Sequence, residues 1–175
     1  MNNLTQLQRD ALREALKLDG LSIEHKNTLK DILDSNKNKE IVPKLFVDGA
    51  ADLHSKTAGI GGVVYINEGE VANFSEPLYE KTNNESEYLS LIKGIQVIHE
   101  LKFSNVLIYS DSELIVKQVT GEYKIKNDRM KKLNDEVKLN LRKLTSWNIE
   151  HVRREKNHRA DELSKLGMEK ARGSK

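Results

Sequence analysis

From residue 44 onward, the chain alternates short apolar runs with longer stretches whose apolar residues recur at helical spacing. The runs of strand length lie at 45–47, 59–66, 71–78, 105–109 and 147–152. The first three follow one another directly, and the later two are separated by helical stripes. The predicted order is therefore three strands in a meander, a helix, a strand, helices, a strand and a last helix. This order is typical of an α/β domain with a five-stranded mixed sheet flanked by helices.

The first forty residues have a different pattern. Leucines and alanines recur at helical spacing from residue 3 to about 18, and Ser22 offers an N-cap for a second stretch that ends near Asn36. We expect a helical hairpin over 1–40, a polar linker at 36–40 and a main domain over 44–170. Seven basic and seven acidic residues balance within the hairpin, which argues against strong phosphate binding and leaves its role open.

Thr82-Asn83-Asn84-Glu85-Ser86-Glu87 introduces the first helix of the main domain. Asn84 is a good N-cap, and Glu87 lies three positions later, where its side chain can reach back to the N–H of the cap. Taken alone, Glu87 is therefore best explained as a capping-box carboxylate. The apolar residues that follow, Tyr88 first, recur at helical spacing and predict a core-facing helix through about residue 101.

Three other acidic residues lie at comparable junctions. Asp48 ends the first predicted strand, Asp111 follows the fourth, and Asp161 lies in the first turn of the last helix. Each has an ordinary explanation as a turn, cap or helix-dipole residue. Together with Glu87, however, they place four carboxylates at one edge of the sheet, where like charges repel unless a cation lies between them. Such hard oxygen ligands suit magnesium or manganese, and a two-ion site suits phosphodiester hydrolysis.

Five motifs occur in order over about 44–170. They are Asp48-Gly49-Ala50, the glycine-rich run 58–64, Thr82-Asn83-Asn84 with Glu87, Ser110-Asp111-Ser112, and Arg154-Glu155 followed by Asn157, Ala160, Asp161 and Leu163. In this order and spacing the chain resembles ribonuclease HI. The resemblance implies endonucleolytic cleavage of the RNA strand of RNA–DNA hybrids with two magnesium ions, manganese being the alternative metal.

The resemblance also implies roles for particular residues. Asp48, Glu87, Asp111 and Asp161 match the metal-binding, catalytic carboxylates. The substrate-binding candidates are Gly49, Thr82, Asn83, Asn84, Ser112 and Asn157. Among these, Asn83 and Asn84 match residues that read the minor groove, where the 2′-hydroxyl distinguishes RNA from DNA. Thr82 matches a contact to a phosphate of the DNA strand.

Two departures from the family pattern bear on catalysis. The segment between the last strand and Asp161, which includes residues 155–160, is short, so the loop that carries a histidine in many members is shortened. His158 is the nearest candidate, and we interpret it, like His151, as an ordinary histidine. The separate basic handle of many members is also missing, although nine basic and four acidic residues occur between Lys117 and Lys143. That excess fits a solvated helix face or phosphate contact.

These departures keep an alternative open, namely a protein that binds hybrids or duplexes on the same fold with weak or no catalysis. A different nuclease or an integrase is disfavoured by the Thr82-Asn83-Asn84 segment. The 29 basic and 27 acidic residues say little about partners, and the 175 residues include no cysteine, no membrane-length apolar run and no secretion signal. We therefore expect a cytoplasmic protein without membrane contact. Activity on double-stranded RNA and the oligomeric state remain open.

Overall fold

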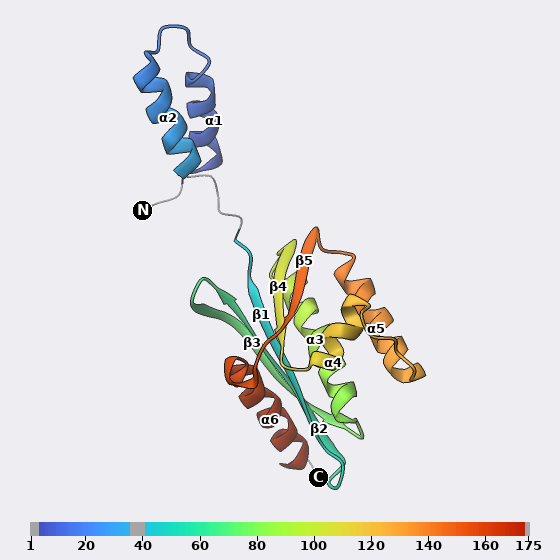
Figure 1. Ribbon diagram of the computed structural model, residues 1–175. Helices are drawn as coiled ribbons and strands as arrows, with labels where there is room; N and C mark the ends of the chain where they lie inside the picture. Colours follow the sequence, from blue (N-terminus) through green and yellow to red (C-terminus); the bar gives the residue numbers. More distant parts are fainter. Residues whose placement is uncertain (1–3, 36–40, 174–175) are drawn as a thin grey trace. The chain divides into compact units, whose positions relative to one another are not determined.

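The computed structural model describes residues 4–35 and 41–173, which fall into two compact units, Met1–Ile41 and Val42–Lys175 (Figure 1). The first unit contains helices α1 (Gln6–Ala15) and α2 (Ile23–Ser35), so both predicted N-terminal helices are present. None of the described side chains between residues 4 and 34 is buried. The predicted linker at 36–40 lies outside the described residues.

The second unit is built on one sheet of five strands. These are β1 (Lys44–Asp52), β2 (Thr57–Ile66), β3 (Gly69–Tyr79), β4 (Asn105–Ser110) and β5 (Ser146–His151). Their order across the sheet is β3-β2-β1-β4-β5. Strands β1, β2 and β3 pair antiparallel, whereas β4 pairs parallel with both β1 and β5. The predicted α/β fold with a five-stranded mixed sheet is confirmed.

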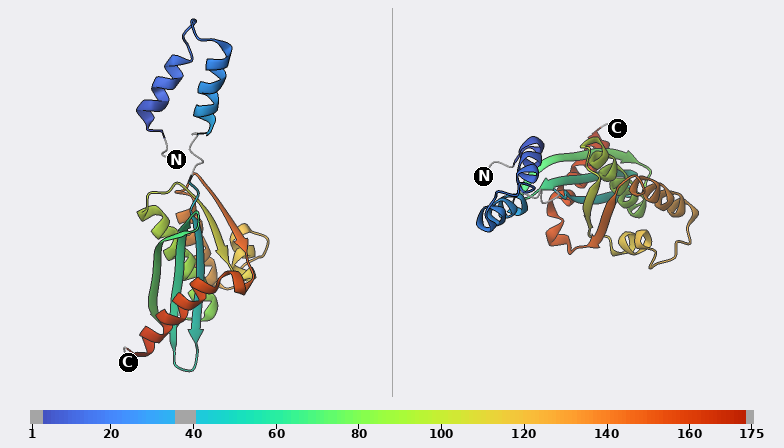
Figure 2. Two further views of the ribbon diagram at one scale, coloured as in Figure 1. Left: turned by 90° about the vertical axis from the view of Figure 1, so that its left-hand side faces the viewer. Right: turned by 90° about the horizontal axis from the view of Figure 1, so that it is seen from above.

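Helices cover both faces of this sheet (Figures 1 and 2). They are α3 (Asn83–Glu100), α4 (Glu113–Thr120), α5 (Asp128–Leu141) and α6 (His158–Gly173), with a short 3-10 turn at Arg154–Lys156. Helix α3 packs on β1 and β2 and contacts α4 and α5 on one face, while α6 crosses β1, β2 and β3 on the other. The main core lies between α3 and the sheet, where Leu45, Tyr88, Ile95 and Ile108 are fully buried. No described helix is long and apolar enough to cross a membrane.

Two glycines allow the helices to approach the strands on both sides. A Cβ atom on Gly49 would lie 2.3 Å from the backbone nitrogen of Glu87 in α3. A Cβ atom on Gly61 would lie 2.2 Å from the backbone nitrogen of Ser164 in α6. Both distances are too short for any side chain, so only glycine permits this packing. Strand β1 and its neighbour β2 are consequently held between the backbones of two helices.

Two predicted boundaries were wrong. Asp48 does not end the first strand, because β1 continues to Asp52 and stays paired with β2 as far as Thr57. The apolar pattern stops at Val47, but the backbone pairing does not depend on that pattern. The helical spacing of the apolar residues from Met130 to Leu144 predicts one long helix. Helix α5 ends at Leu141, so Leu144 lies beyond the observed helix, although it is buried as a core residue.

The N-cap of α3 also differs from the prediction. Thr82 is the cap rather than Asn84: its hydroxyl accepts from the N–H of Glu85, and the Glu85 side chain accepts from the N–H of Thr82 at 2.9 Å. The segment contains two overlapping candidates for a capping box, and the earlier one forms. Glu87 therefore has no part in capping the helix.

Candidate metal centre

The sheet register brings Asp48 and Asp111 together. Val47 of β1 pairs with Ser110, the last residue of the parallel strand β4. The residues that follow them, Asp48 within β1 and Asp111 directly after β4, are therefore neighbours. Glu87 comes from the first turns of α3, which Gly49 allows to lie directly on β1. Three segments that are far apart in the sequence thus place three carboxyl groups at one point.

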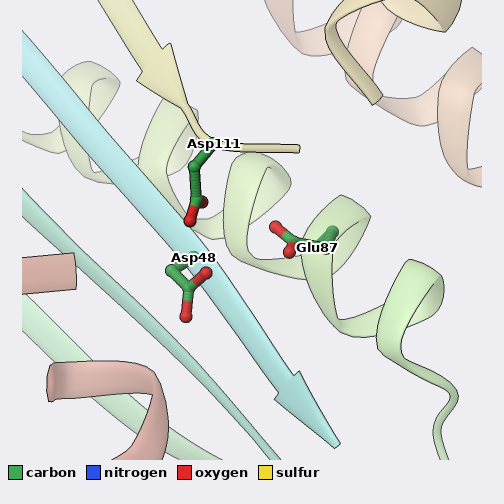
Figure 3. A group of neighbouring side chains, drawn as sticks. All are labelled: Asp48, Glu87 and Asp111. Atoms are coloured by element: carbon green, nitrogen blue, oxygen red, sulfur yellow. The ribbon is translucent and has the colours of Figure 1, made fainter. Parts of the chain in front are cut away.

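The three carboxyl groups form a compact cluster (Figure 3). Asp48, Glu87 and Asp111 each offer one carboxylate oxygen, and these oxygens all lie within 4.8 Å of one another. Asp48 and Glu87 are each only 6 % exposed. Their side chains turn toward a common space between β1, the end of β4 and the start of α3 (Figure 3).

The electrostatics of the cluster favour a cation. Burial, together with the nearby Asp48 and Asp111, raises the pKa of Glu87 to about 9. Burial raises the pKa of Asp48 to about 6 against a lowering hydrogen bond from Ser164, with Asp111 and Asp161 adding to the rise. Oxygen Oε2 of Glu87 is buried and has no hydrogen-bond partner. Converging carboxylates with an unsatisfied buried oxygen fit a divalent cation with hard oxygen ligands.

Asn157 holds this cluster in place. Its side-chain nitrogen Nδ2 donates to the backbone oxygen of Val47 and to Oδ1 of Asp111, both at 2.9 Å. Asn157 is 1 % exposed, so it supports the acids from behind and does not present its side chain to the solvent. Asn157 thus links β1, Asp111 and the start of α6, and the substrate contact expected for it stays a prediction.

Asp161 lies beside the cluster but is not one of its three members. Its Oδ1 accepts from Arg154 at 2.7 Å and its Oδ2 accepts from Lys165 at 2.6 Å. Burial alone would raise the pKa of Asp161, but the hydrogen bonds from Lys165 and Arg154 outweigh it, and the pKa is lowered. Asp161 is thus held in its charged form by two cations.

An open pocket of about 460 Å³ lies over these acids. Gly49, Asn83 and Ser112 line it, whereas Thr82 and Asn84 are exposed at the start of α3 without belonging to its lining. Ser112 occupies the N-cap position of α4 but makes no side-chain capping bond. The complete lining consists of Asp48, Gly49, Ala50, Ala51, Asn83, Glu87, Asp111, Ser112, Arg154, Asp161, Lys165 and Met168.

The two histidines near the site are ordinary surface residues. The His158 side chain is 75 % exposed and its Nδ1 lies 3.5 Å from Glu162, outside the pocket lining. His151, at the end of β5, is exposed. In the basic stretch from Lys117 to Lys143, Lys117 forms an ion pair with Glu113 and Arg129 forms one with Glu85. Part of the positive charge of this stretch is therefore neutralised by ion pairs within the protein.

Sequence reasoning assigned no role to three residues that contact the acids: Arg154, Ser164 and Lys165. Lys165 lies four positions after Asp161, which is the spacing of an ion pair on one helix face, so this contact could have been predicted from the sequence. Arg154 belongs to a recognised motif, but nothing in that motif indicates which acid it pairs with. Ser164 gave no signal, since its contact with Asp48 spans 116 residues.

Comparison with known proteins agrees with this fold. A model of the family described as "Reverse transcriptase-like" matches residues 46–167. The chain is 28 % identical over 127 residues to ribonuclease HI of Halobacterium salinarum; the match covers 72 % of this chain and 64 % of that protein. It covers only 35 % of a Mycobacterium tuberculosis protein described as bifunctional, at 30 % identity. The chain thus spans less than two thirds of these relatives.

Two solved structures are similar to this domain. The crystal structure of ribonuclease H1 from Halobacterium salinarum has a TM-score of 0.71, and the similarity covers 74 % of this chain and 98 % of that one at 28 % identity. LC11-RNase H1, solved in complex with an RNA/DNA hybrid, has a TM-score of 0.69 with 31 % identity, covering 74 % of this chain and 98 % of that one.

The fold, the acidic pocket and the family match together define the class: the chain belongs to the reverse transcriptase-like family. Within that family it falls with ribonuclease HI, which confirms the resemblance carried by the five motifs.

Proposed function

We propose that this protein is a metal-dependent endonuclease that hydrolyses the RNA strand of RNA–DNA hybrids. The observation that carries the proposal is the cluster of Asp48, Glu87 and Asp111, the first two buried, in the lining of an open pocket. A related protein of the same fold was solved with an RNA/DNA hybrid, which supports hybrids as the substrate class. The four motif acids favour an enzyme over a pure binding protein, because a negative cluster without a cation repels phosphates.

Asp48, Glu87 and Asp111 would hold one divalent cation, and Asp161 would help to hold a second. Oxygen ligands of this kind favour Mg²⁺, with Mn²⁺ as the alternative. When bound, such ions activate a water molecule and stabilise the leaving oxygen in phosphodiester hydrolysis. The protein itself supplies the geometry: Asn157 orients Asp111, and Arg154 and Lys165 keep Asp161 charged.

Substrate selection would fall to the start of α3. Asn83 and Asn84 are exposed there, and Asn83 lines the pocket beside the acids. Their amide groups can donate to and accept from a 2′-hydroxyl, which only the RNA strand carries. Thr82 would contact a phosphate of the DNA strand, in addition to its capping role. Gly49 and Ser112, which line the pocket beside the acids, would contact the RNA strand.

The proposal is tested with one end-labelled strand sequence presented as a hybrid, as double-stranded RNA and as single-stranded RNA. Each is incubated with Mg²⁺, Mn²⁺ or chelator. We expect metal-dependent cleavage of the RNA strand of the hybrid. Asp48→Asn should lower this cleavage by at least about a thousandfold, since it removes a ligand charge with little change in shape, and should leave the circular dichroism spectrum unchanged.

The outcomes separate the alternatives. Unchanged cleavage by Asp48→Asn would contradict the assignment of the acids. Hybrid binding without cleavage under either metal would favour the alternative of a binding protein and would point to the shortened loop after β5. Cleavage of double-stranded RNA would widen the substrate class without altering the site.

A further inference from the structure

Ser164 is placed directly over Asp48 by the packing of α6 on the sheet. Asp48 pairs in register with Gly61 of the neighbouring strand, and the backbone of α6 lies against Gly61 because that residue has no side chain. The helix residue at this contact is Ser164, which is 0 % exposed. A short side chain on a helix this close to the strand reaches the Asp48 carboxyl group without any water between them.

The Ser164 hydroxyl is hydrogen bonded to Oδ2 of Asp48. The same hydroxyl oxygen lies 2.9 Å from the backbone oxygen of Asp161. A serine hydroxyl has one hydrogen to donate, and a charged carboxylate is the stronger acceptor of the two. Among the described residues, no other side chain is shown hydrogen bonded to Asp48.

The hydrogen bond from Ser164 occupies one of the two carboxylate oxygens of Asp48. Figure 3 shows one oxygen of Asp48 turned toward Asp111 and Glu87 and the other turned away from them. Because Ser164 binds Oδ2, the carboxylate plane cannot rotate without breaking a buried hydrogen bond. Ligands fixed by a second hydrogen-bonded residue bind metals more tightly, and losing such a residue typically weakens metal affinity about 10–100-fold.

We propose that Ser164 is a positioning residue of the metal centre, one that fixes the orientation of the Asp48 carboxylate from α6, which packs on the face of the sheet opposite to α3. The proposal rests on the proposed metal-dependent function of the site. It adds that α6 contributes to the centre in two ways: through Asp161 directly and through Ser164 by way of Asp48. A small serine at a tight helix–strand contact also has a simple packing explanation, so the test must separate the two.

Ser75 provides the matched control. Its hydroxyl donates to the backbone oxygen of Leu163 at 2.8 Å, so it also links the sheet to α6 by a serine hydrogen bond. It contacts none of the four acids. Ser164→Ala and Ser75→Ala each remove one hydroxyl from the contact between α6 and the sheet, and only the first removes a bond to Asp48. Ser164→Cys keeps nearly the same volume with a weaker donor, and serves if the alanine variant folds poorly.

Binding of Mn²⁺ to the protein without nucleic acid is measured from the electron paramagnetic resonance signal of the free ion. Thermal unfolding of each variant is measured in chelator. We expect Ser164→Ala and Ser164→Cys to weaken Mn²⁺ binding about tenfold, and Ser75→Ala to leave it within about twofold of the wild type. The kcat for the hybrid should fall in the Ser164 variants at low metal and recover partly at high metal, with KM for the hybrid unchanged.

Equal Mn²⁺ affinity in Ser164→Ala and the wild type would overturn the proposal, as would an equal loss in Ser164→Ala and Ser75→Ala, which would show a packing effect. Failure of the proposed function has a different signature: the wild type would bind Mn²⁺ and cut no hybrid. The ratio of metal affinities would still decide the role of Ser164 in that case.

Discussion

At the scale of single residues, the acidic cluster is destabilising until a cation is bound. Burial and the two neighbouring aspartates raise the pKa of Glu87 to about 9, and burial raises that of Asp48 to about 6. The native state therefore binds protons that the unfolded state releases, so the stability of the metal-free protein falls as pH rises from about 4.5 toward 9. The pKa of Asp161 is shifted in the opposite direction, but this shift changes the stability only at pH values below 3.8, the ordinary pKa of an aspartate.

We expect Glu87→Gln to stabilise the metal-free protein at pH 7 by up to about 3 kcal/mol and to abolish cleavage, because folding of the wild type must protonate Glu87 at a pH where the unfolded chain leaves it charged. Urea unfolding in chelator at pH 5, 7 and 8 measures this. The gain should fall below about 1 kcal/mol at pH 5, and Mg²⁺ should stabilise the wild type more than the variant.

Glu85→Gln is the control for this variant. The pKa of Glu85 is lowered, chiefly by its hydrogen bond from the Thr82 backbone, so its charged form stabilises the fold. Its replacement should slightly destabilise the protein at pH 7. A loss of stability in both Glu87→Gln and Glu85→Gln would contradict the conclusion that the Glu87 carboxyl group destabilises the metal-free protein.

At the scale of elements, the packing of helices against glycines determines the site. The strands and helices were predictable from sequence because periodicity is a local property, and the register of β1 with β4 follows from the family fold. The N-cap of α3 was not predictable, since Thr82 with Glu85 and Asn84 with Glu87 satisfy the same local pattern. The partners of the acids were not predictable either: Ser164 reaches Asp48 only through tertiary packing.

Gly61→Ala tests this packing. The added methyl group would lie 2.2 Å from the backbone of α6 at Ser164, so the helix must move away. We expect a loss of about 2–3 kcal/mol in urea unfolding, together with weaker metal binding. Gly69→Ala is the matched control, since its Cβ would meet only the Ile66 oxygen at 3.7 Å. Equal stability of the two variants would contradict the close contact.

At the scale of the whole molecule, the second unit, which carries the acidic cluster, has its own core. The buried cluster that includes Leu45, Ile95 and Leu141 lies entirely within Val42–Lys175, and the family match begins at residue 46. The N-terminal helices, in contrast, contain no buried side chain among their described residues. The stability of the second unit therefore does not depend on buried contacts within the first.

Deletion of residues 1–41 should leave a folded protein that melts within about 5 °C of the full chain and cuts hybrids with a similar kcat. Thermal unfolding and the cleavage assay on both proteins measure this. A deletion variant that aggregates, or that loses cleavage while remaining folded, would show that the N-terminal unit supports the catalytic one.

The position of α6 also has a consequence for synthesis on the ribosome. Asp48 leaves the exit tunnel early, but its partner Ser164, the cover of the β1–β3 face and Asp161 are all translated more than a hundred residues later. A nascent chain that stops before α6 has an uncovered sheet and an incomplete metal centre. The proposed metal centre is therefore complete only when translation has passed α6.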